Sequence, residues 1–151
     1  MLLLAKPSVR AVLLARLGRL TPSSRARWGA LDASRLLCHL ADSLHVALGE
    51  LDAGPLVPGF AATAVGRWLA ISSPLPWPKG IRVPEGFFLT PAEAGAFERD
   101  RVVLRDLIGR FAEPGRIARW GVSPAFGALS ATQWSRLCAR HLDHHLRQFG
   151  L

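Results

Sequence analysis

The sequence predicts an all-α fold in a single domain spanning residues 1–151. Hydrophobic residues make up 50% of the chain and charged residues 20%, a balance that supplies a core and argues against disorder. Apolar residues recur at helical spacing in five segments that are bounded by proline, glycine and capping residues. No segment shows the strict alternation or the Asn-Gly turn that predicts a β-hairpin.

Capping residues place the first helices. Ser8 is predicted to cap a helix that continues to about Leu20, and Asp32 to cap a second helix over about residues 33–51. A shorter apolar segment over about residues 60–71 predicts an additional short helix.

The stretch 72-SSPLPWPKGIRVPEGFFL-89 contains so many helix and strand breakers that we predict a long Pro/Gly-rich loop. Loops of this length in a compact domain are usually functional or disordered. Its aromatic residues Trp77, Phe87 and Phe88 favour a loop that packs back on the body, where it could cover a site.

Two capping boxes predict the remaining helices. The sequence 90-TPAE-93, with proline at the first helical position, is expected to start a helix that ends near Ala112. The sequence 130-SATQ-133 is expected to open the last helix, which Gly150 would end.

The charge pattern argues against nucleic acid as a partner. The formal net charge is +8, and all but two of the 19 basic residues are arginine. They are scattered along the chain and interleaved with acidic residues, as in 98-ERDRVVLRD-106, whereas nucleic-acid contacts need clustered positive charge.

Residues 1–20, MLLLAKPSVRAVLLARLGRL, resemble neither a membrane span nor a signal peptide because basic residues interrupt the apolar run. We therefore expect no membrane association and a cytoplasmic protein. Cys38 and Cys138 are the only cysteines, and both are expected to be reduced thiols.

The last helix places two histidines on its core-facing side. At about 100° per residue, His141 and His145 share one face with Trp134, Leu137, Cys138 and Gln148. A buried imidazole needs partners for its nitrogens, and either a metal ion or hydrogen bonds to the protein could satisfy this pair. The spacing alone favours neither. His144 is predicted to lie at the boundary of this face.

A third histidine ligand could come only from the second helix, which carries His39 and His45. His39 borders the apolar face beside Ser43 and Val46, whereas His45 lies on the far side, so His39 is the better candidate. Asp42 could orient a ligand imidazole, although a solvated position on the helix fits it better.

Three segments resemble one family. They are 28-WGALDASRLLCHLADSLHVALGE-50, 124-PAFGALS-130 with Trp134, and 141-HLDHHLRQFG-150. The chain resembles the DinB-like (DinB/YfiT) superfamily of metalloenzymes, and more narrowly a domain-of-unknown-function branch of it. The resemblance implies an antiparallel four-helix bundle whose metal ligands are His39, His141 and His145. Asp42 and Gln148 are the candidates for residues that orient those ligands. Cys138 is left outside the ligand set, because a lone buried cysteine more often serves as small packing.

Three histidines leave open positions on a divalent ion, for which Zn²⁺ and Ni²⁺ are our leading expectations. Such an ion suits hydrolysis or thiol transfer of a small-molecule substrate. The resemblance favours a thiol-dependent S-transferase that uses a low-molecular-weight thiol, and it implies a homodimer. The alternative is a non-catalytic stress or interaction protein that a metal ion stabilises.

No motif identifies a catalytic residue. Glu85 and Glu98 are carboxylates that the predicted loop and helix could bring near the site. The family branch is expected to have a histidine directly before the Pro-x-Phe-Gly segment, where this chain has Ser123. Any role of that histidine is therefore in doubt here.

Overall fold

The computed structural model describes residues 2–54, 59–80 and 90–151. Over these residues the protein is mostly helical, and the sheet found among them consists of two short strands. The predicted all-α class is confirmed at this level. None of the described helices combines the length and the apolar character that crossing a bilayer requires.

Four helices of eleven residues or more enclose the core: α1 (Pro7–Leu17), α2 (Ala33–Ala47), α4 (Phe97–Arg110) and α5 (Ala131–Gln148). Between α2 and α4 lies a helical lobe, residues 60–72, made of η1 (Phe60–Ala62), α3 (Ala64–Arg67) and η2 (Trp68–Ser72). After α4 come η4 (Pro114–Arg116) and a hairpin of β1 (Val122–Ser123) and β2 (Gly127–Ala128).

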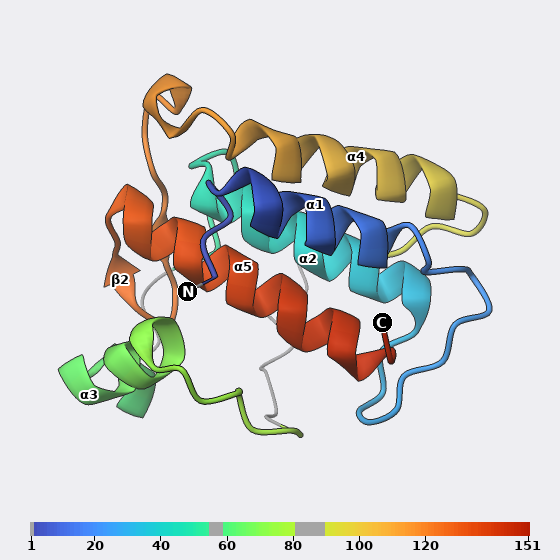
Figure 1. Cartoon of the computed structure of the whole chain (residues 1–151), viewed down its shortest axis with the longest axis horizontal. Coiled ribbons are helices and arrows are strands. Elements are labelled where there is room, and N and C mark those ends of the chain that lie inside the picture. The colour runs from blue at the N-terminus through green and yellow to red at the C-terminus, as the bar shows by residue number, and fades with distance from the viewer. Residues whose placement is uncertain (1, 55–58, 81–89) are drawn as a thin grey trace.

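Helices α1 and α5 run in one direction, and α2 and α4 run in the other (Figure 1). Near the ends of α1 and α5, the Arg16 guanidinium donates to the Asp143 carboxylate at 2.6 Å. Glu50, just after α2, forms an ion pair with Arg110 at the end of α4. Helix α2 therefore faces α5 in antiparallel orientation and α4 in parallel orientation. The parallel pair requires a long connection, which contains the helical lobe.

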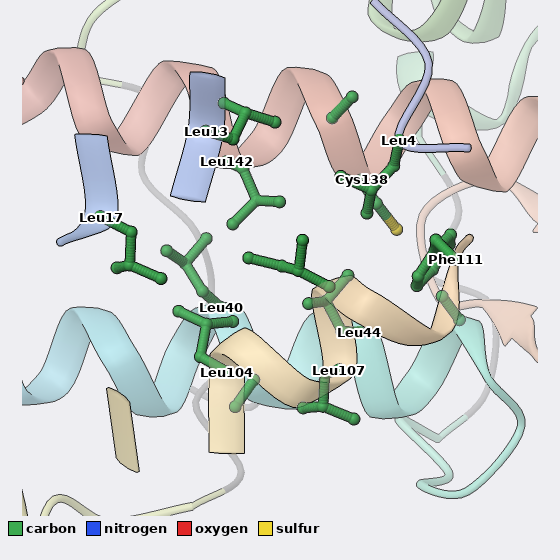
Figure 2. Packing of buried hydrophobic residues seen from close by; sticks show 14 of the residues in the cluster. Leu4, Leu13, Leu17, Leu40, Leu44, Leu104, Leu107, Phe111, Cys138 and Leu142 are labelled. Carbon is green, nitrogen blue, oxygen red and sulfur yellow. The ribbon is translucent and has the colours of Figure 1, made fainter. Parts of the chain in front are cut away.

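The core lies where these four helices meet. Leu40 and Leu44 of α2 point toward Leu142 of α5 and Leu104 of α4 (Figure 2), and all four are at most 1% exposed. Leu13 of α1 points into the same space (Figure 2). Burying each such side chain stabilises the fold by about 1.5–3 kcal/mol.

The predicted helix starts were correct for two helices and wrong for two. Asp32 caps α2 by accepting from the Arg35 N–H, and Ser130 and Gln133 form the capping box of α5. Helix α1 instead begins at Pro7, so Ser8 lies inside it.

Helix α4 begins at Phe97 and not at the predicted box 90-TPAE-93. Gly95 precedes it with a φ of +78°, a left-handed conformation that a continuous helix cannot contain. The Thr90 hydroxyl and N–H both donate to the Asp42 carboxylate, at 2.6 and 2.9 Å. Because the Thr90 hydroxyl donates to Asp42 of α2, it does not cap a helix at its own position in the chain.

The expectation of no hairpin was also wrong. Ser123 pairs with Gly127, and the Ser123 hydroxyl accepts from the N–H groups of Ala125 and Phe126 inside the turn. This side chain closes a three-residue turn, residues 124–126, that has no Asn-Gly signal.

Residues 73–80 are the described part of the predicted loop, and we call them the strap. They pack back on the body as expected. The Trp77 indole N–H donates to the Ala70 carbonyl, and Arg140 of α5 donates to the carbonyls of Ser73 and Leu75. The predictions for Phe87 and Phe88 lie outside the described residues.

We predict that Leu44→Ala lowers the free energy of unfolding by about 2–5 kcal/mol, because it leaves a cavity between α2 and its neighbours. Chemical denaturation measures the loss. The control Val102→Ala, at a position that is 63% exposed, is expected to change stability by less than about 0.5 kcal/mol. Equal losses in the two variants would contradict this placement of the core.

Candidate metal centre

The antiparallel contact of α2 and α5 brings three histidines together. His39 lies in the middle of α2, and His141 and His145 lie one turn apart on α5. Their ring planes meet edge to face, with centroids 4.7–5.0 Å apart. One nitrogen from each ring lies within 4.8 Å of the other two. The structure thus assembles the three residues that the sequence proposed as ligands.

The His39–His141 pair has the spacing of two ligands on one ion. Their Nε2 atoms are 3.0 Å apart. Nitrogens bound to Zn²⁺ at about 2.0–2.1 Å are about 2.9–3.4 Å apart when the angle between them is 90–110°. Two ligands of one such ion can be at most about 4.2 Å apart, so a pair at the 4.8 Å limit has to move closer when it binds.

Ser43 determines which nitrogen of His141 carries the proton. The Ser43 hydroxyl donates to the Leu40 carbonyl at 2.8 Å, so its oxygen is left to accept from His141 Nδ1, 3.2 Å away. His141 is therefore protonated at Nδ1, and the lone pair of Nε2 points toward His39. A metal ligand needs this tautomer.

Gln148 determines which nitrogen of His145 carries the proton. Its amide nitrogen donates to the Trp28 carbonyl at 2.7 Å, which directs its oxygen to His145 Nδ1 at 2.8 Å. The predicted orienting role of Gln148 agrees with this contact. Gly29 makes the approach feasible: its φ is +75°, and a Cβ there would lie 2.7 Å from the Gln148 amide nitrogen.

The site favours neutral imidazoles. Burial, and then the neighbouring His145 and His39, hold the pKa of His141 well below its usual 6.5. Burial and His39 lower the pKa of His145 to about 3. His141 and His145 are therefore neutral, and the unprotonated nitrogen of each can bind a cation without first losing a proton.

A cavity of about 660 Å³ opens beside the histidines, and both His39 and His141 line it. Its other walls come from the helical lobe, the strap, the hairpin and the adjoining faces of α2 and α5. Among the described residues, four with aromatic hydrocarbon rings line it, namely Phe60, Trp77, Phe126 and Trp134. The Trp77 ring lies 5.9 Å from the His141 ring. A cavity of this size holds a small organic molecule.

Comparison with known proteins gives no match. No family model matches the chain, and neither a curated protein nor a solved structure is similar to it.

The donor set itself fits a divalent ion. Three neutral imidazoles suit Zn²⁺, Ni²⁺ and related metals, and a three-histidine set is typical of sites that keep a position open. Cys138 stays outside the histidine cluster and is 3% exposed, and burial raises the pKa of its thiol.

The other polar residues considered from the sequence do not belong to the histidine cluster. Asp42 is 3% exposed, so the solvated alternative was wrong, and its carboxylate accepts from Thr90. His45 lies outside the cluster and contacts Glu50 at 2.8 Å. His144 lies between the rings of Trp28 and Trp77, with centroids 6.0 and 5.6 Å away.

Glu98 does not join the site, and the expectation for Glu85 is not tested. Glu98 is exposed and forms an ion pair with Arg101, and Glu85 lies outside the described residues. Ser123 lines the cavity, but its hydroxyl already accepts hydrogen bonds within the hairpin turn.

Sequence reasoning missed Ser43 as the partner of His141. The signal was present, because Ser43 lies one turn after His39 on the same face of α2. The contact of Trp77 with the site had no comparable signal, since it depends on how the strap folds.

We predict that the metal-free protein, dialysed against Zn²⁺ or Ni²⁺, binds one ion per chain and that His39→Ala and His141→Ala abolish this binding. Ser43→Ala and Gln148→Ala are expected to weaken it about 10–100-fold, because the tautomers are no longer fixed. Isothermal titration calorimetry measures both effects. The control His45→Ala should bind like the wild type, and equal binding by all variants would refute the site.

We also predict that the metal-free protein loses stability as the pH falls below about 6.5, the pKa of histidine in the unfolded chain. His141 and His145 stay neutral when folded, so the unfolded state binds more protons, and each contributes a slope of about 1.4 kcal/mol per pH unit. Their stabilisation is complete above that pH and decreases toward the folded-state pKa. Urea denaturation of the wild type and of His145→Asn at pH 7, 6 and 5 tests this. If the free energy of unfolding changed equally with pH in the two proteins, the prediction would be contradicted.

Proposed function

We propose that the chain is a divalent-metal-dependent enzyme of the DinB-like type, an antiparallel four-helix bundle with one added helical lobe. We further propose that it catalyses thiol-dependent S-transfer to a small molecule. The observation that carries this proposal is the convergence of three imidazole nitrogens beside a cavity of about 660 Å³. Two of the three rings line that cavity, so a substrate there would meet the site.

The fixed tautomers of His141 and His145 support a catalytic metal centre more than a structural one. Ser43 and Gln148 orient two lone pairs from outside the cluster, which fixes the donors before any ion arrives. Three protein ligands leave a position for water or substrate, whereas structural zinc sites have four.

The cavity favours thiol transfer over hydrolysis. A bound divalent ion supplies Lewis acidity, which lowers the pKa of a coordinated thiol or water. Among the described lining residues the one carboxylate is Asp42, and its two oxygens accept from Thr90. No other described lining residue has a carboxylate that could act as a general base. A thiol, with a pKa of about 8.5, needs much less help to ionise than water at about 15.7.

We predict that the Zn²⁺- or Ni²⁺-loaded protein accelerates thioether formation between 2-mercaptoethanol, a neutral thiol, and the activated aryl chloride 1-chloro-2,4-dinitrobenzene. The sulfur–carbon bond forms, the carbon–chlorine bond breaks, and chloride and the thiol proton leave. His39→Ala is expected to remove the acceleration and His45→Ala to preserve it, which product chromatography measures. The same rate in both variants would refute the proposal.

Removing the metal separates this proposal from the alternative of a non-catalytic, metal-stabilised protein. The core of leucines at the junction of the four helices does not include the histidines, so the metal-free chain is expected to stay folded by circular dichroism at 25 °C. Unfolding on chelation, with no thioether formed by the loaded protein, would favour the structural role instead.

A further inference from the structure

The described walls of the cavity beside the histidines are nearly free of charge, although the protein carries a net charge of +8. None of its described lining residues is lysine or arginine. Its carboxylate, Asp42, accepts hydrogen bonds from Thr90. An anionic ligand buried there would lose its hydration without gaining an opposite charge, which costs free energy.

Two arginines beside the walls, Arg140 and Arg67, donate to backbone carbonyls. Arg140 donates to the carbonyls of Ser73 and Leu75 in the strap, and Arg67 donates to the carbonyl of Phe126 in the hairpin. These cations hold two walls of the cavity in place. They do not appear among the residues that line it.

The aromatic walls also present apolar faces. The Trp77 indole N–H donates to the Ala70 carbonyl, and the Trp134 indole N–H donates to the Gly121 carbonyl at 3.1 Å. Both indoles therefore have their polar atom satisfied by the protein. What remains toward the cavity is ring surface, which together with Phe126 and Leu137 suits an aromatic or branched aliphatic group.

We propose that the cavity binds a neutral, largely apolar small molecule with an aromatic body. The polar or reactive end of this ligand faces His39 and His141. This proposal deepens the proposed function by naming its substrate class. Only the orientation of the ligand's polar end rests on that function. The preference for a neutral body rests on the walls alone, so it can be tested without metal.

The first test uses the metal-free full chain and two probes of similar shape, phenylbutanol and phenylbutyrate. Calorimetric titration is expected to show phenylbutanol binding at least about tenfold more tightly than the carboxylate, because no wall residue pairs with the anion. Equal binding, or tighter binding of phenylbutyrate as the net positive charge alone would favour, overturns the proposal.

A matched pair of variants places the ligand. Ala125 lines the cavity from the hairpin turn, whereas Ala128 is exposed on strand β2 of the same hairpin. Ala125→Phe is expected to weaken phenylbutanol binding at least about tenfold by filling the space, and Ala128→Phe to leave it unchanged. Circular dichroism checks that both fold, and equal affinities in the two folded variants overturn the assignment to this cavity.

A third probe separates the failure of this proposal from failure of the metal site. Phenylbutanethiol is expected to bind the Zn²⁺-loaded protein at least about tenfold more tightly than the metal-free protein, because its thiolate is a metal ligand. If zinc gives no gain while the alcohol still outbinds the carboxylate, the apolar cavity stands and the proposed function fails. If neither preference appears, both fail.

Discussion

The arrangement depends on one constraint, which is that three imidazoles share the contact between α2 and α5. A buried imidazole nitrogen that lacks a partner costs free energy, and this applies to both rings on α5. Ser43 and Gln148 accept hydrogen bonds from Nδ1 of His141 and of His145, so the Nε2 atoms of these two rings point toward His39. These contacts need the register of α5 against α2 that the leucine packing provides. The position of Gln148 also explains why the chain approaches the end of α5 through a glycine, Gly29.

Helix α2 serves both the core and the site through different faces. Leu40 and Leu44 are fully buried among the leucines of the other helices, while His39, Ser43 and Val46 line the cavity. The leucine face fixes the position of the helix by apolar burial, and the polar face uses that position to place its donors. Because the two faces have separate partners, the packing that holds α2 does not depend on what the cavity contains.

The sequence predicted features that depend on one element and its period. The face shared by His141 and His145, the Ser130 capping box and the Asp32 cap follow from local spacing, and all three are present. The convergence with His39 involves residues about a hundred positions apart, and it needed the family resemblance to become specific.

Predictions failed where a distant residue competed with a local one. The capping box at Thr90 has the right letters, but Asp42 accepts its hydroxyl and N–H, and Gly95 adopts a left-handed conformation before the helix starts. The hairpin likewise depends on the Ser123 side chain bonding to the turn and not on a recognised turn dipeptide. Neither contact can be read from spacing along the chain.

The parallel course of α2 and α4 has a consequence for how such a protein can diversify. The long crossover that joins them supplies the helical lobe and the strap, and none of the three histidines lies on it. Substitutions or length changes there would reshape what enters the cavity and leave the donor atoms on their two helices. The same scaffold could therefore be retargeted, by natural variation or by grafting, through exchange of a single connecting segment.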